Sequence, residues 1–76
     1  MKQIKIYTTN SCVYCLMAKT LLKQKGLEYQ EIDLSNDLSL REELSEKYKW
    51  RSVPMILIDD KFIGGYDDLN KIKDQL

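Results

Sequence analysis

Two cysteines three positions apart are the residues of this sequence whose types and spacing could do chemistry. Cys12 and Cys15 are the only cysteines of the chain, and a run with helical periodicity follows them. A close cysteine pair can exchange disulfides, supply half of a metal site, or fill a core as small buried side chains. The rest of the sequence discriminates among these three interpretations.

The chain contains no histidine, which weighs against two of the chemistries open to a cysteine. A tetrahedral zinc site needs four cysteine or histidine ligands, so carboxylates or a second subunit would have to complete the shell. A cysteine hydrolase needs a base such as histidine to take the thiol proton. Thiol-disulfide exchange needs no such partner, because the leaving thiolate is a tolerable anion. The pair therefore fits exchange chemistry, and we expect no metal.

The position of each cysteine relative to the helix predicts its role. Cys12 follows a strand and a polar loop and stands at the helix entrance, where free N–H groups and the helix dipole favour an anion. Cys15 lies about one turn further along, within reach of the first sulfur but beyond most of that field. We therefore predict that Cys12 attacks as a thiolate, and that Cys15 stays protonated and resolves mixed disulfides.

Composition and charge limit the remaining classes of function. Seventy-six residues make one small domain, which we expect to cover residues 1–76 and to fold alone. The twelve basic and twelve acidic side chains cancel, so no net field favours nucleic acid or an anionic membrane as a partner. We identify neither a signal peptide nor a membrane span. We therefore expect a cytoplasmic protein, where a cysteine pair is more often catalytic or metal-binding than structural.

Seven elements in the order βαβαββα are predicted to position the pair. The predicted strands cover residues 2–7, 29–34, 55–58 and 61–63, and the predicted helices cover residues 12–25, about 38–48, and the segment from Asp67 to Leu76. Two strands joined by a helix should lie parallel, whereas the late hairpin is antiparallel. The sequence thus predicts an α/β fold, with a four-stranded mixed sheet flanked by three helices.

Polar residues and glycine are predicted to set the ends of these elements. Gly26 supplies a stop for the first helix. Ser39 fits the first position of a capping box for the second helix, and Asp67 is predicted to be the N-cap of the last one. Asp59 and Asp60 predict the hairpin turn between the last two strands.

Three motifs in chain order resemble those of the small dithiol glutaredoxins, and the resemblance runs nearly from end to end. Three motifs at the family's spacing are more specific than one Cys-x-x-Cys pair alone. The motifs are Cys12-Val13-Tyr14-Cys15, Ser52-Val53-Pro54 and Gly64-Gly65-Tyr66-Asp67-Asp68. The resemblance implies a thioredoxin-like fold and glutathione as the reductant. It also implies that Cys12 attacks a glutathionylated or disulfide substrate and that Cys15 can resolve the product.

The resemblance further implies a glutathione site. The backbone of Val53, which precedes a proline that is cis in the family, would pair with the cysteinyl part of glutathione. Amides near Gly65 would take the γ-glutamyl carboxylate, while an aspartate would hold its ammonium group. The residues predicted to bind glutathione are Tyr14, Arg51, Val53, Pro54, Gly65, Tyr66, Asp67 and Asp68.

Three positions depart from the family's pattern. Thr9 stands where a lysine is common, which removes one cation that would favour the thiolate. Val13 replaces the common proline, so the segment gains an N–H and backbone freedom that bear on the redox potential. Trp50 stands where a ligand of the glycyl carboxylate is common. Arg51 or Lys49 would then have to substitute for that ligand.

The sequence therefore predicts an enzyme that reduces protein-glutathione mixed disulfides and other disulfides with glutathione. We expect a monomer whose partners are glutathione and disulfide-bonded or glutathionylated proteins. Thr9 and Val13 leave open a glutaredoxin-like electron donor reduced by thioredoxin reductase, although the segment Gly65-Tyr66-Asp67-Asp68 argues against it. The missing proline also leaves room for a glutathione-bridged iron-sulfur cluster carrier.

Overall fold

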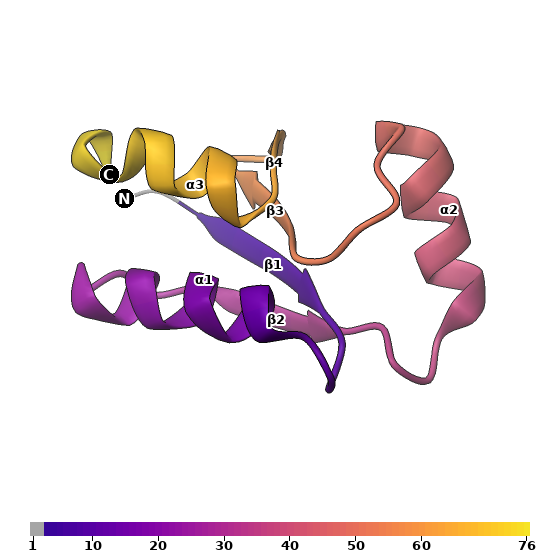
Figure 1. Cartoon of the computed structure of the whole chain (residues 1–76). Coiled ribbons are helices and arrows are strands. Elements are labelled where there is room, and N and C mark those ends of the chain that lie inside the picture. The colour runs from indigo at the N-terminus through magenta and orange to yellow at the C-terminus, as the bar shows by residue number, and fades with distance from the viewer. Residues whose placement is uncertain (1–2) are drawn as a thin grey trace.

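The computed structural model describes residues 3–76, and its elements follow the predicted order. A short 3-10 helix, η1 (Lys73–Gln75), follows the last helix, and it was not predicted as a separate element. Lys2, which the sequence prediction placed in the first strand, lies outside the described residues. The strands are β1 (Ile4–Thr8), β2 (Gln30–Asp33), β3 (Met55–Ile58) and β4 (Lys61–Gly64), and the helices are α1 (Val13–Gln24), α2 (Leu38–Tyr48) and α3 (Tyr66–Ile72) (Figure 1).

The strands form one mixed sheet in the order β2-β1-β3-β4. Strand β1 pairs parallel with β2 and antiparallel with β3, and β3 pairs antiparallel with β4. Asp59 and Asp60 between β3 and β4 both have positive φ angles, 51° and 67°, as a type I′ hairpin turn requires. The predicted four-stranded mixed sheet flanked by three helices and the predicted turn are thereby confirmed.

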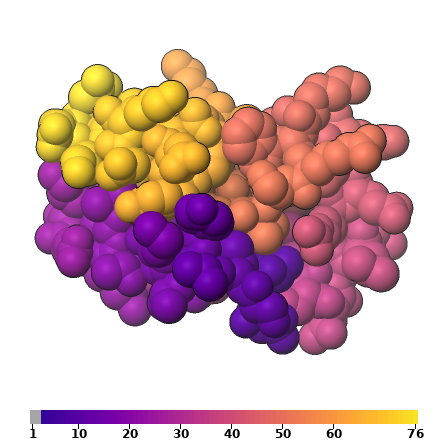
Figure 2. Space-filling view, viewed as in Figure 1, coloured from indigo at the N-terminus to yellow at the C-terminus, as the bar shows by residue number. Residues whose placement is uncertain are grey.

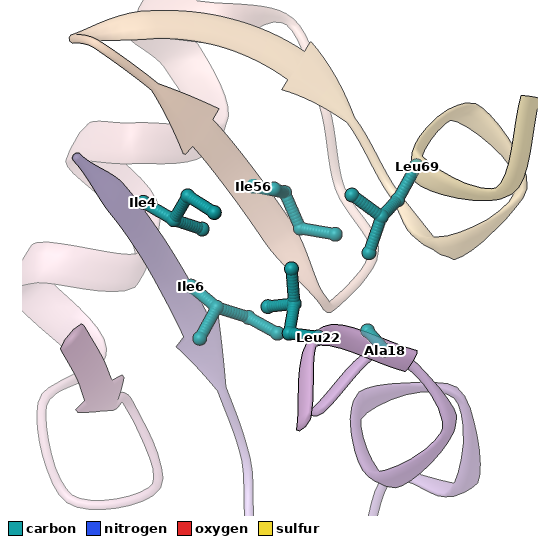
Figure 3. Packing of buried hydrophobic residues seen from close by; sticks show 6 residues of the cluster. All are labelled: Ile4, Ile6, Ala18, Leu22, Ile56 and Leu69. Carbon is teal, nitrogen blue, oxygen red and sulfur yellow. The ribbon is translucent and has the colours of Figure 1, made fainter. Parts of the chain in front are cut away.

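Helices α1 and α3 lie next to each other and cover one face of the sheet, whereas α2 stands apart from both (Figure 1). Side chains from two central strands and these two helices point toward one another and form the larger core cluster (Figure 3). The cluster contains Ile4, Ile6, Ala18, Leu22, Ile56 and Leu69. On the other face, Leu44 of α2 packs with Leu34 and Met55. Burying each large aliphatic side chain contributes roughly 1.5–3 kcal/mol, so both faces hold the sheet in place.

The buried face of α1 carries the second cysteine. Cys15, Ala18 and Leu22 recur at helical spacing and are the buried residues of this helix. Gly26, with a φ of 69°, follows the C-cap and ends the helix as predicted. Packing of α1 on the sheet therefore fixes where the first turn, and with it Cys12, stands.

Two of the predicted helix caps are wrong. Asp37, rather than Ser39, is the N-cap of α2, and its carboxylate accepts a hydrogen bond from a first-turn amide at 3.0 Å. An aspartate that precedes Ser39 by two positions is as good an acceptor, so the helix begins earlier. Gly65, rather than Asp67, is the N-cap of α3. The Asp68 carboxylate accepts from the Gly65 N–H at 3.1 Å and closes this helix start.

Candidate active site

Cys12 is the N-cap residue of α1, so its predicted place at the helix entrance is confirmed. Its backbone is extended, and its Sγ atom accepts a hydrogen bond from the Cys15 N–H at 3.1 Å. That amide belongs to the first turn of the helix, whose N–H groups have no acceptor within the helix. An amide donor and the positive end of the helix dipole both favour negative charge on a sulfur atom. The main chain therefore supplies an environment suited to a thiolate.

The second neighbour of the Cys12 sulfur comes from the loop before β3. Its Sγ lies 3.5 Å from the carbonyl oxygen of Val53, to which a protonated thiol donates. The peptide bond between Val53 and Pro54 is cis, as the resemblance implied. The contact joins the first and second sequence motifs in one place.

Cys15 lies in the opposite environment, facing the core. Its side chain is only 1% exposed. Burial, together with a smaller effect of hydrogen bonding with Cys12, raises the pKa of its thiol from 9.0 to about 12. Both cysteines are free thiols in this structure. The Cys15 thiol is therefore neutral at physiological pH, as predicted for a resolving cysteine.

An ion pair lies one turn beyond Cys15 on the same helix. Lys19 Nζ is 3.0 Å from Glu31 Oε2, and the buried Thr8 hydroxyl donates to the same oxygen at 2.7 Å. Thr8 and Lys19 lower the pKa of Glu31, and Glu31 raises the pKa of Lys19. These side chains link α1, the helix whose start holds both cysteines, to strands β1 and β2. Sequence reasoning missed them, because no short spacing links the three positions.

A cleft of about 290 Å³ lies beside the Val53 contact with Cys12. All of the residues predicted to bind glutathione, except Arg51, line this cleft. Two further lining residues, Trp50 and Ser52, adjoin the second motif. The complete lining consists of Tyr14, Trp50, Ser52, Val53, Pro54, Gly65, Tyr66, Asp67 and Asp68. The fold therefore gathers the three sequence motifs around one hollow.

Aromatic rings form the walls of the cleft. The Trp50 indole lies against the start of α3, with its Cζ2 atom 3.4 Å from the point where a Cβ atom at Gly65 would stand. The Trp50 ring packs edge-on against Phe62 at 5.5 Å, and its buried Nε1 has no hydrogen-bond partner within residues 3–76. The rings of Tyr14 and Tyr66 lie 6.2 Å apart. Sequence reasoning identified Trp50 only as a departure from the family pattern, and its role as a wall depends on tertiary packing.

The start of α3 gives one end of the cleft its charge pattern. Asp67 and Asp68 both stand in the first turn. The Asp68 carboxylate accepts a hydrogen bond from the Gly65 N–H, whereas the Asp67 carboxylate is exposed and open to a cation. The Tyr66 and Asp67 amides belong to the first turn and are open to an anion. This end of the cleft is therefore suited to a group that carries both an ammonium and a carboxylate.

A larger groove of about 760 Å³ runs along α2. Arg51 and Lys49, the two candidates for a glycyl carboxylate ligand, line this groove and not the smaller cleft. The other lining residues are Leu38, Arg41, Glu42, Ser45 and Glu46. Neither cysteine lines either hollow, but the smaller cleft contains Val53, whose carbonyl oxygen lies 3.5 Å from the Cys12 sulfur. The smaller cleft is therefore the one beside the reactive sulfur. Contact between Arg51 and glutathione stays a prediction.

The described part of the chain forms neither a metal cluster nor a membrane span. Residues 3–76 hold no group of three or more histidine, cysteine, aspartate or glutamate side chains that could bind a metal ion. No helix in this range is long and apolar enough to cross a membrane.

Comparisons with known proteins agree on one family. A family model described as Glutaredoxin matches residues 4–63. Glutaredoxin 3 of Escherichia coli (strain K12) is 42% identical over 69 residues, which cover 91% of this chain and 83% of that protein. The solution structure of glutaredoxin from Brucella melitensis is 41% identical, with a TM-score of 0.83, and the match covers 96% of this chain and 79% of that one. A buckwheat glutaredoxin-glutathione complex matches with a TM-score of 0.90 at 27% identity over 97% of this chain and 70% of that one. The predicted thioredoxin-like fold is thereby confirmed.

Proposed function

The chain belongs to the glutaredoxin family of thiol-disulfide oxidoreductases, and on this premise we propose that it reduces protein-glutathione mixed disulfides and other disulfides with glutathione. The observation that carries the proposal is the Cys12 sulfur, which accepts the Cys15 N–H at 3.1 Å and contacts Val53 at the edge of the cleft. A relative has been crystallised as a glutathione complex, which supports the same ligand here. We further propose a monomer that acts in the reducing cytoplasm, where such a pair is kept reduced.

The proposed reaction of a glutathionylated protein consists of two exchanges. The Cys12 thiolate attacks the glutathione sulfur, so a Cys12-glutathione disulfide forms, the bond to the protein sulfur breaks, and the protein thiolate takes a proton from water. A second glutathione, as its thiolate, then attacks the glutathione sulfur held on Cys12. Oxidised glutathione leaves and the Cys12 thiolate is restored. One mixed disulfide is reduced and one glutathione disulfide is formed, and Cys15 takes no part.

A protein disulfide requires Cys15 as well. Cys12 first forms a mixed disulfide with one protein sulfur, and the other protein sulfur leaves as a thiol. Cys15 then loses its proton and attacks the Cys12 sulfur, which releases the second protein thiol and leaves an internal disulfide that two glutathione molecules reduce. The charge on Cys12 is among the causes that raise the pKa of Cys15. Because the mixed disulfide removes that charge, Cys15 ionises more readily when it is needed.

The cleft offers partners for the cysteinyl and γ-glutamyl parts of glutathione. The Val53 backbone would pair with the cysteinyl part beside the Cys12 sulfur, and Pro54 and Tyr14 would flank it. The Tyr66 and Asp67 amides would hold the γ-glutamyl carboxylate, and the Asp67 side chain would hold the ammonium group. Gly65 and Asp68 would keep the helix start in position through their hydrogen bond. We assign Arg51, from the neighbouring groove, to the glycyl carboxylate.

Turnover of a glutathione mixed disulfide, coupled to glutathione reductase, tests this proposal with two matched variants. Cys12→Ser should abolish turnover, whereas Cys15→Ser should retain most of it and lose only the reduction of protein disulfides. Equal loss in both variants would contradict the assigned roles. Reduction by thioredoxin reductase without a response to glutathione would make the chain an electron donor of another kind. Visible absorbance from a glutathione-dependent dimer would instead indicate a cluster carrier.

A further inference from the structure

The first turns of α1 expose apolar side chains beside the reactive sulfur. Val13 is 72% exposed, Leu16 is 62% exposed and Met17 is 39% exposed. We call these three residues the apolar rim. Within residues 3–76, the other large hydrophobic side chains exposed to a similar degree are Tyr14, which lines the cleft, and Leu38, which lies on α2.

The apolar rim is one continuous surface, because its residues stand at positions i, i+3 and i+4 of a helix and share a face. That face lies opposite Cys15 and Ala18, which are buried against the sheet. Figure 2 shows the indigo start of α1 open to solvent, between the yellow-orange α3 and the orange loop that precedes β3. Single exposed apolar residues are common on proteins, whereas a cluster next to a nucleophile marks a contact surface.

We propose that the apolar rim docks the polypeptide of protein substrates, and that it favours oxidised cysteines flanked by apolar residues. The inference rests on the proposed function, in which glutathione fills the cleft between Val53 and α3. The departing protein sulfur must then lie on the open side of the glutathione sulfur. The polypeptide that carries it passes within reach of the residues that follow Cys12, so the rim is continuous with the reacting atoms.

The chemistry of the rim selects for an apolar partner and not for a charged one. Its three side chains are uncharged, and the first charged residue along α1, Lys19, is paired with Glu31 at 3.0 Å. Attraction at this surface is therefore hydrophobic and resists salt. A second copy of the chain fits less well, because a stable dimer buries roughly 20–30 residues on each side. Three side chains suit a brief encounter with a substrate.

Two glutathionylated peptides of equal length and charge test the proposal, one with Leu and Val beside its cysteine and one with Ser and Thr. The mixed disulfide of glutathione and free cysteine serves as a third substrate without a polypeptide. Wild-type protein should show a kcat/KM about tenfold higher for the apolar peptide than for the polar one, which corresponds to about 1.4 kcal/mol. The double variant Leu16→Ser, Met17→Gln should lose this preference and keep its activity toward the small substrate.

Leu38→Ser is the matched control, because Leu38 is 68% exposed on another helix. It should keep the preference, and an equal loss in this variant would overturn the docking site. Equal turnover of the two peptides by wild-type protein would also overturn it, although activity toward the small substrate would leave the proposed function standing. No activity toward the small substrate would remove both proposals. Sedimentation that shows a wild-type dimer, broken by the double variant, would assign the rim to self-association instead.

Discussion

The Sγ atom of Cys12 lies 3.1 Å from the backbone nitrogen of Cys15, so the second cysteine supports the first through its main chain while its own thiol is buried. The start of α1 separates the two sulfurs by environment. One stands at the N-cap, partly open to solvent, and the other faces the core one turn later. This asymmetry supports the proposed roles, in which Cys12 attacks and Cys15 resolves.

Burial of Cys15 predicts that the free energy of unfolding falls at alkaline pH. The pKa of this thiol is about 12 in the folded protein against 9.0 for an unperturbed cysteine, so the unfolded chain releases the proton first. Stability from this group is complete below about pH 9 and is lost as the pH rises toward 12. Urea unfolding under reducing conditions should show that wild-type protein loses about 1 kcal/mol more than Cys15→Ala between about pH 8 and about pH 10. Parallel losses in both proteins would contradict this, since lysine and tyrosine titration is common to them.

Asp67 and Asp68 form a matched pair with different predicted roles. Asp68→Ala removes the carboxylate that accepts the Gly65 N–H and should lower the free energy of unfolding by about 1 kcal/mol. Asp67→Ala leaves that bond intact and should instead raise KM for glutathione about tenfold, because one charge-assisted contact is lost. Urea unfolding and coupled kinetics on both variants measure the two effects. The reverse pattern would show that the wrong aspartate has been assigned to the ligand.

Emission from Trp50 should report the occupancy of the cleft. Trp50 is the only tryptophan of the chain and it lines the cleft beside Val53. Forming the glutathione mixed disulfide on Cys15→Ser should quench its fluorescence, and dithiothreitol should restore the signal. Cys12→Ser, treated in the same way, should show no change. Identical traces from the two variants would place glutathione outside this cleft.

The order of the elements could be predicted from the sequence because its causes are local. Alternation identifies β1, a short apolar run identifies β3, and Asp59-Asp60 marks the hairpin turn between β3 and β4. The caps were harder, because Asp37 and Ser39 both offer an acceptor and only the geometry of the helix start decides between them. The closing helix likewise has a glycine, Gly65, as its N-cap residue, and the carboxylate that completes the cap belongs to Asp68, three residues later.

Two kinds of feature could not be predicted: contacts between residues distant in the sequence, and which apolar residues of a helix face the core. The oxygen shared by Lys19 and Thr8 belongs to Glu31, on another strand, and no motif announces it. The packing of Trp50 against the start of α3 also joins residues that are distant in the sequence, so no motif predicts it. Helical periodicity alone also does not reveal that Leu16 is exposed, because an apolar residue on a helix is normally expected to face the core.

Limited alkylation of the reduced native protein near neutral pH tests most directly whether the helix start creates one reactive sulfur and one protected sulfur. Fragmentation of the peptide that carries both cysteines in a mass spectrometer locates the label. We expect label on Cys12 and almost none on Cys15 in the native protein, and similar labelling of both once the chain is unfolded. Equal labelling of the two cysteines in the native protein, or a Cys12 that reacts only in alkaline solution, would contradict it.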